Sequence, residues 1–161
     1  NNGLKKEIIE KVSISAIKYS ILKQAVGGDI VYDFEKSISF EGDSGPYLQY
    51  SCARAKSVLE KAKEEGIEIS AKEFPIETTE LEKLLYRFPE VVERAGKEDA
   101  PHYIATYLTE LARAFNGFYA NNKIIDKNDK NSSYRVALTS AFATTMKNGL
   151  KLLGILVPER M

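Results

Sequence analysis

Apolar residues recur at every third or fourth position along most of this chain, a pattern typical of amphipathic helices. It predicts helices over residues 5–24, 47–65 and 100–120, a further helix that begins near 79, and a last helix that ends near 153. Strand-like alternation is almost missing, so the pattern predicts a mainly helical protein with no internal repeat of fixed period.

Local signals indicate where these helices begin and break. Thr78 or Thr79 is expected to cap the third helix, with Glu82 completing a capping box after Thr79. Weak helix formers at Ser13-Ile14-Ser15 are expected to interrupt the first helix. Pro89 is expected to open a separate turn or helix that ends near 96.

The connections carry their own signals. Pro46, after a Gly-rich loop, suits the first turn of the second helix, and Ser132 or Ser133 is expected to cap the last one. A brief β-prone run at 30–32 leads into a helical turn, a connection follows through Pro75, and polar residues 121–133 read as a surface loop. Together these features predict an all-α fold, a helical bundle.

One helix has two distinct faces. Its core stripe follows a spacing of three and four and consists of Leu48, Cys52, Ala55, Leu59 and Ala62. Tyr47, Tyr50 and Arg54 lie about 100° away on a neighbouring face. Two tyrosines and an arginine on one face can stack on bases and pair with phosphate. The same tyrosines can equally bury their rings against the next helix, so the pattern leaves both readings open.

The helix over 100–120 divides in the same way. Its predicted core stripe consists of Ile104, Leu108, Leu111, Phe115 and Phe118. Near its end, Asn116 and Tyr119 belong to a polar group that can read base edges. Asparagine is also common where helices end, so this feature too has a purely structural reading.

Charge is balanced overall and uneven along the chain. The 161 residues include 23 Lys and Arg and 23 Asp and Glu. The net charge is +1 over residues 1–59, −5 over 60–99 and +4 over 100–161. A basic last third suits a polyanionic partner, although ordinary variation in surface charge would look the same.

Composition excludes much chemistry. His102 is the single histidine and Cys52 the single cysteine, so no two-histidine metal site, cysteine-based zinc site or internal disulfide can form within the chain. No Walker A or GxGxxG motif occurs, and no apolar run approaches the roughly 18 residues of a membrane span. Cys52 falls in a core stripe and is expected to be a small buried hydrophobe. A reduced, cytoplasmic location is the simplest expectation, and Asn at position 1 favours a fragment of a longer protein.

Four ordered segments closely resemble the C-terminal part of arginyl-tRNA synthetases. The segment FEGDSGPYLQY at 40–50, followed by Ala53-Arg54, is similar to the start of that family's anticodon-binding domain. The other matching segments are AIKY at 16–19, PHY through FNGFY within 101–119, and the C-terminal pattern from Gly149 to Met161. Serine at position 44 replaces the commoner threonine and keeps a hydroxyl that can cap a helix.

The resemblance implies a function that periodicity does not show. The family is a class I aminoacyl-tRNA synthetase that joins arginine to its tRNA with ATP and magnesium, and its C-terminal domain is an all-α bundle that grips the anticodon stem and loop. Residues 43–161 would be this bundle, and 1–42 would be a segment that follows the catalytic core. The HIGH- and KMSKS-type catalytic motifs do not occur here, so the chain alone is expected to be inactive and to work with the N-terminal catalytic domain of the same protein.

The resemblance also selects candidate residues. Tyr47, Tyr50, Arg54, Tyr119 and Met161 match tRNA contacts of the family, the last through its side chain and terminal carboxylate. With Asn116 they form the predicted tRNA-binding set, and no catalytic or metal-binding residue is assigned. Some family members carry an aromatic contact a few residues after Tyr119, where this chain has Lys123. The alternatives are a stand-alone helical adaptor that binds protein through its aromatic faces, or an independent small enzyme.

Overall fold

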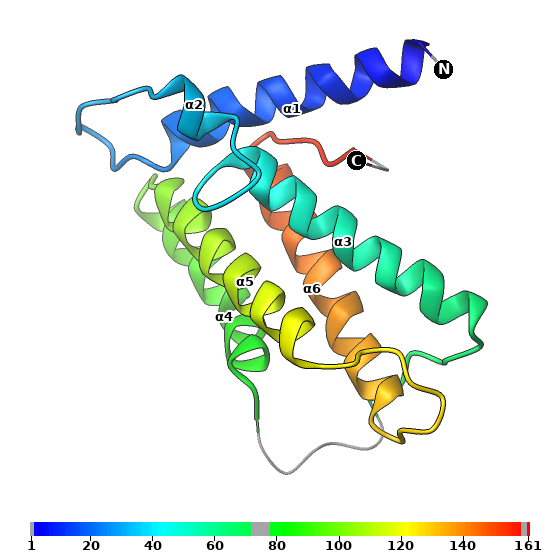
Figure 1. The fold of residues 1–161 in the computed structure, drawn as a ribbon. Coiled ribbons are helices and arrows are strands. Elements are labelled where there is room, and N and C mark those ends of the chain that lie inside the picture. The colour runs from blue at the N-terminus through cyan, green and yellow to red at the C-terminus, as the bar shows by residue number, and fades with distance from the viewer. Residues whose placement is uncertain (1, 72–77, 159–160) are drawn as a thin grey trace.

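The fold consists of helices and loops throughout the part of the chain that is described. A computed structural model describes residues 2–71, 78–158 and 161. The helices there, shown in Figure 1, are α1 (Asn2–Leu22), α2 (Phe34–Ser37), α3 (Gly45–Glu64), α4 (Glu80–Lys97), α5 (His102–Asn121) and α6 (Ser132–Leu152). The predicted all-α fold is confirmed.

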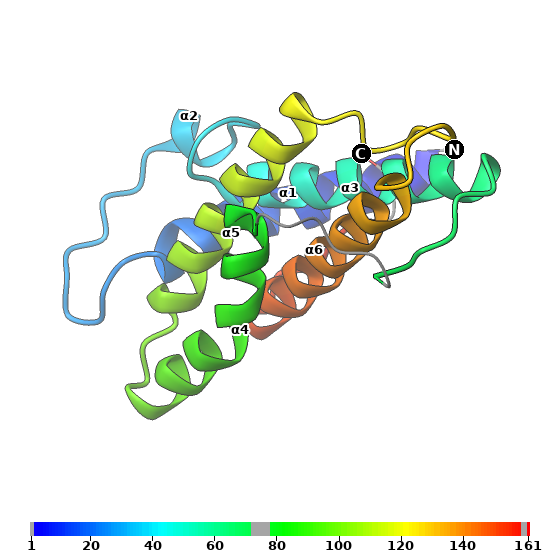
Figure 2. The ribbon, with the colours of Figure 1, turned by 90° about the horizontal axis from the view of Figure 1, so that it is seen from below.

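Four long helices form the bundle and a fifth crosses it. Helices α3, α4, α5 and α6 pack on one another, and α1 lies across α3 (Figures 1 and 2). The chain leaves α6 and returns between α1 and α3, so the C-terminal segment runs beside the start of α3 (Figure 1). This arrangement brings the beginning of α3 close to the C-terminus.

The core is formed by the stripes that the spacing predicts. Leu48, Cys52 and Ala55 of α3 are fully buried, while Leu59 is only partly buried. Phe115 of α5 stacks on Phe142 of α6 with ring centroids 3.9 Å apart. Burying such a ring contributes about 1.5–3 kcal/mol, which is why these helices need no disulfide to associate.

Helix α1 is continuous through residues 13–15, so the predicted break is wrong. Ser15 and Ala16 are buried where α1 meets the first turn of α3. A Cβ at Gly45 would lie 2.3 Å from both the carbonyl and the hydroxyl oxygen of Ser15, so only glycine allows this close approach. Tertiary packing therefore outweighs the weak helix propensity of this stretch.

Pro89 does not open a separate element, which is a second correction. It lies inside α4, which runs unbroken from Glu80 to Lys97. Its ring is exposed, and buried Leu84 and Ala95 anchor the helix to the core on either side. Packing on both sides thus holds together a helix in which proline removes one backbone hydrogen bond.

Some predicted signals act as expected and others do not. The capping box of Thr79 and Glu82 is confirmed, since each side chain accepts a hydrogen bond from the other residue's backbone N–H. Ser132 does not cap α6. Its hydroxyl instead donates to the Ile124 carbonyl, 2.8 Å away, and accepts from the Asp126 N–H, closing the preceding loop. Residues 30–32 form no strand, and Pro75 of the predicted connection lies outside the described residues.

Candidate nucleic-acid interface

The start of α3 is fixed by a cap and a polar cluster that is buried on the side of Tyr19 and Thr109 and exposed at Asp43. The Ser44 hydroxyl accepts from the Tyr47 backbone N–H at 3.1 Å, which confirms the expected capping role of this serine. Just before it, the Asp43 carboxylate accepts a short hydrogen bond from the Tyr19 hydroxyl and pairs with Lys23 at 3.2 Å. The Tyr19 hydroxyl also lies 2.5 Å from the hydroxyl of Thr109 on α5. The cluster thereby joins α1, α3 and α5 at the point where α3 begins.

Hydrogen bonds and partial burial set the protonation states in this cluster. Burial raises the pKa of the Asp43 carboxyl, but hydrogen bonds from Tyr19, Lys23 and Thr109, together with the Lys23 charge, outweigh burial, so the pKa lies below its usual range. Burial and the neighbouring Asp43 raise the pKa of the Tyr19 phenol well above its usual value. Asp43 is therefore ionised and Tyr19 neutral at neutral pH, as their hydrogen bond requires.

Asn116 of α5 links the candidate residues of α3. Its side-chain nitrogen donates to the Tyr47 hydroxyl at 2.9 Å and to the Ser51 hydroxyl at 3.0 Å. Its side-chain oxygen accepts from Arg54 Nη1 at 2.6 Å. One amide thus holds Tyr47 and Arg54 in fixed positions across the α3–α5 contact.

Arg54 lies between two exposed tyrosines. Its guanidinium carbon is 4.9 Å from the centroid of the Tyr50 ring and 5.2 Å from that of Tyr119, within the range of cation–π attraction. The two tyrosines are 39% and 43% exposed. Arg54 pairs with no carboxylate in the part of the chain that the structure describes, so its charge is available to a ligand.

These side chains line an open groove of about 750 Å³ between α3 and the segment that follows α5. Lys61 and Lys123 add positive charge to its wall, with Lys123 also 3.0 Å from Asp126. Met161, 41% exposed, borders the groove beside Tyr50. One basic, aromatic surface is therefore formed by residues of α3, the end of α5 and Met161.

Four of the six predicted residues line the groove, and the other two support them. Tyr50, Arg54, Tyr119 and Met161 line the groove, and Asn116 bonds to Arg54 from behind. Tyr47 is different, because its ring is half-buried and its hydroxyl is engaged by Asn116. The ring of Tyr47 therefore packs within the bundle, as one of the two readings of the spacing expects, and its contact with tRNA stays a prediction.

The structure adds residues that sequence patterns did not single out. Phe40 packs edge-on against Tyr50 with ring centroids 6.1 Å apart, extending the groove into an apolar patch lined by Ile9, Val12 and Met161. No spacing rule could pair Phe40 with Tyr50, because an irregular loop separates them. Lys61 lies two helical turns after Arg54, so its place on the same face could have been found from periodicity.

The remaining chemistry-bearing side chains lie away from the groove. Cys52 is buried and burial raises the pKa of its thiol, so it packs as a hydrophobe, as predicted. His102 packs on Tyr103 with ring centroids 4.3 Å apart. Over the ranges described, no three His, Cys, Asp or Glu side chains gather into a metal site, and no helix is both long and apolar enough to cross a bilayer.

Known proteins match both the sequence and the fold. The chain is 40% identical over 166 residues to the arginine–tRNA ligase of Thermococcus kodakarensis and 42% identical over 162 residues to that of Pyrococcus abyssi. Each match covers 98% of this chain and 26% of the relative, so the chain spans about a quarter of the length of these relatives.

Solved structures and a family model agree with this. The arginyl-tRNA synthetase of Thermus thermophilus superposes with a TM-score of 0.82 at 32% identity, over 98% of this chain and 28% of that one. The Plasmodium falciparum arginyl-tRNA synthetase, 24% identical, shares the fold with a TM-score of 0.74 over 94% of this chain and 27% of that one. The family model of the DALR anticodon binding domain matches residues 48–161. The predicted resemblance is thus confirmed, and the chain belongs to the DALR anticodon-binding domain family.

Proposed function

We propose that this chain is the anticodon-binding module of an arginine–tRNA ligase and that its groove receives an opened anticodon loop of an arginine-accepting tRNA. The observation that carries the proposal is the position of Arg54 between the exposed rings of Tyr50 and Tyr119, in a chain of the anticodon-binding family. Splayed bases of single-stranded loops stack on such rings, and a guanidinium binds phosphate or a base edge.

The contacts suggest a division of roles. Tyr50 and Tyr119 offer ring faces to unstacked bases, while Arg54 supplies a charge that no carboxylate of the described chain neutralises. Asn116 and Tyr47 keep the guanidinium in place before the RNA arrives. Preorganisation of this kind raises affinity because less side-chain freedom is lost on binding. Met161 would close the groove beside Tyr50.

Charge further along the chain suits the stem of the same RNA. Residues 100–161 carry a net charge of +4, and exposed cations such as Lys127, Lys147 and Lys151 follow α6 and the loop before it. Cations along a helix of this kind would neutralise successive phosphates of the stem.

The catalytic part of the parent protein would carry out the joining of arginine to tRNA. ATP and magnesium would act in the catalytic part of the parent protein, since these 161 residues contain no HIGH- or KMSKS-type motif, and the chain alone would be inactive. Residues 1–42 would connect that part to the bundle of residues 43–161. Exposed apolar side chains, among them Ile17, Val31 and Phe34, offer it a surface to pack on. Anticodon binding here would help to position the distant acceptor end, so that binding energy contributes to the rate of transfer. A cytoplasmic location remains our prediction.

Affinity measurements on two tyrosine variants test the proposal. We expect Tyr50→Ala to lower the affinity for an arginine-accepting tRNA by about 1–3 kcal/mol, the contribution of one base–aromatic stack. Tyr86→Ala is the matched control, because Tyr86 is 88% exposed on α4, outside the groove. Unchanged affinity in Tyr50→Ala, with the helical circular dichroism intact, would reject the groove as the binding site.

Salt titration separates this function from the adaptor alternative. Binding to phosphates weakens steeply as salt is added, because neutralised phosphates release counterions. An aromatic protein interface depends far less on salt. A binding constant for tRNA that does not change between 50 and 200 mM salt, a range over which several phosphate contacts would cost orders of magnitude, would favour the adaptor.

A further inference from the structure

The segment after α6 is tied down along its length. Ile155 is 1% exposed and inserts into the core, and Pro158 is buried. The Lys18 ammonium of α1 donates to the Gly154 carbonyl at 2.6 Å. Residues 153–158, which we call the C-terminal strap, are therefore held in place up to three residues before the terminus.

A further hydrogen bond to the strap comes from a buried side chain of α3. Gln49 is fully buried, and its amide nitrogen donates to the Leu156 carbonyl of the strap at 2.6 Å and to the Lys11 carbonyl of α1 at 3.2 Å. Both partners are carbonyl oxygens, so only the amide nitrogen can face them. The single side chain of Gln49 thus joins α1, α3 and the strap.

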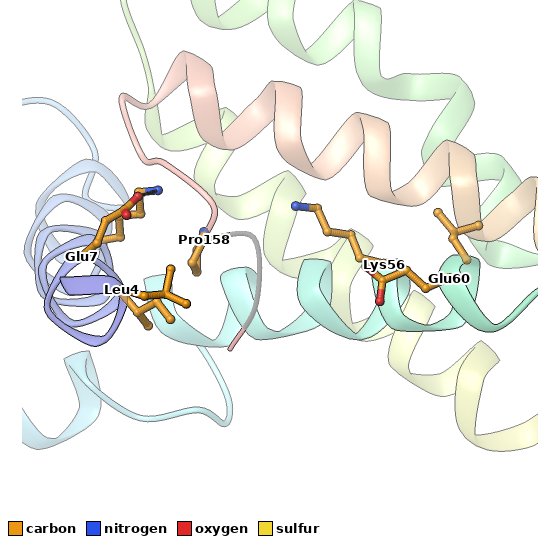
Figure 3. Close-up of a pocket in the computed structure, with 8 residues that line it drawn as sticks. Leu4, Glu7, Lys56, Glu60 and Pro158 are labelled. Atoms are coloured by element: carbon orange, nitrogen blue, oxygen red, sulfur yellow. Dashed lines mark hydrogen bonds and ion pairs between the residues drawn. The ribbon is translucent and has the colours of Figure 1, made fainter. Parts of the chain in front are cut away.

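Figure 3 shows where this leaves the end of the strap. Pro158 lies between Leu4 and Glu7 of α1 on one side and Lys56 of α3 on the other, at the edge of a cavity of about 670 Å³. A chain covers at most about 3.6 Å per residue, so the position of Pro158 limits Met161 to within about 11 Å. Met161 borders the groove beside Tyr50.

Neighbouring positions on α3 therefore face different surroundings. Consecutive residues of a helix point about 100° apart, so Gln49 turns toward the strap while Tyr50 faces the groove. We propose that Gln49 is a positioning residue: by holding the Leu156 carbonyl, it fixes the strap so that Met161 lies beside Tyr50. This inference rests on the proposed function, since Met161 matters there only if the groove binds RNA.

A double-mutant cycle tests the inference on the full 161-residue chain. Gln49→Leu removes the donor at similar volume, and the second variant lacks Met161. Each is expected to weaken binding of an arginine-accepting tRNA about tenfold, and the double variant no more than either one alone, because both changes remove the same contact. If the two losses multiply instead, Gln49 does not act through Met161 and the inference is overturned.

Two further measurements keep the result interpretable. Cys52→Ala creates a cavity beside the same helix, away from the strap, and so controls for lost stability. It should leave the affinity for tRNA unchanged. Carboxypeptidase release of Met161 from the free chain should be at least several times faster in Gln49→Leu than in Cys52→Ala, and this readout requires no RNA. Equal release rates would overturn the inference even if Tyr50→Ala weakens binding. If Met161 is released faster from Gln49→Leu but no form of the chain binds tRNA, Gln49 does hold the strap and the proposed function is rejected.

Discussion

Replacing Asn116 with aspartate tests whether the charge of Arg54 contributes to RNA binding. Asn116 accepts from Arg54 Nη1 at 2.6 Å, so Asn116→Asp puts a carboxylate of nearly the same shape against the guanidinium. A charge-assisted hydrogen bond contributes about 1.5–3 kcal/mol, which offsets the loss of the amide's two donated bonds. The hydroxyl of Tyr47 can turn to donate in place of accepting. We therefore expect the fold to persist while the charge of Arg54 is neutralised.

The expected change in binding follows from counterion release. Losing one phosphate contact should lower the slope of log K against log salt by about 0.7–0.9. We also expect the affinity for tRNA to fall about tenfold, or about 1.4 kcal/mol. The assay is a salt titration of tRNA binding, monitored by fluorescence anisotropy, with circular dichroism to check folding.

A neighbouring amide provides the control for net charge. Asn121 is exposed near the end of α5 and bonds only to the Gly117 carbonyl among the described residues, so Asn121→Asp adds the same charge without touching Arg54. Asn116→Asp should have the larger effect on both affinity and slope. An unchanged salt slope in Asn116→Asp, or an equal change in Asn121→Asp, would refute the assignment of Arg54 to phosphate.

Two further predictions concern the start of α3. Gly45→Ala should destabilise the fold by about 1–3 kcal/mol, because the new Cβ would lie 2.3 Å from two oxygens of Ser15. Thermal unfolding should show a Tm that is lower by about 2–4 °C for each kcal/mol of lost stability. An unchanged Tm would contradict the close approach of the two helices. Tyr19→Phe removes a donor that helps to hold the pKa of Asp43 below its ordinary 3.8. A depressed carboxyl pKa contributes stability that is present above the unfolded pKa and is lost as the pH falls through the folded one. Urea unfolding should therefore show that wild type loses more stability than Tyr19→Phe as the pH falls below about 4, and parallel curves would contradict the role of this hydrogen bond.

The sequence predicts best what depends on near neighbours. The core stripe of α3, the cap at Ser44 and the capping box of Thr79 and Glu82 each involve residues within a turn or two, so spacing reveals them. The break expected at residues 13–15 and the stop expected at Pro89 are wrong for one shared reason. At both positions, packing against distant elements keeps the helix continuous, and helix propensity alone does not describe such packing.

The candidate surface shows the same limit. Spacing places Tyr47, Tyr50 and Arg54 near one another on α3. It cannot show that Asn116 forms hydrogen bonds with both Tyr47 and Arg54, because 62 residues separate Asn116 from Arg54. The resemblance to arginyl-tRNA synthetases selected these residues without assigning their separate tasks. The three-dimensional contacts separate the supporting Tyr47 from the exposed Tyr50 and Tyr119.

In the proposed function, this groove recognises an open anticodon loop. The most direct test compares the affinity of the wild-type chain for two RNA hairpins that share the anticodon stem of an arginine-accepting tRNA. One hairpin carries the native seven-nucleotide loop, and the other carries a tight four-nucleotide loop whose bases stay stacked. We expect the native loop to bind more tightly by at least about 2 kcal/mol, the contribution of one or two base–aromatic stacks. Equal affinity for the two hairpins would show that the chain binds only the stem backbone and would contradict the account.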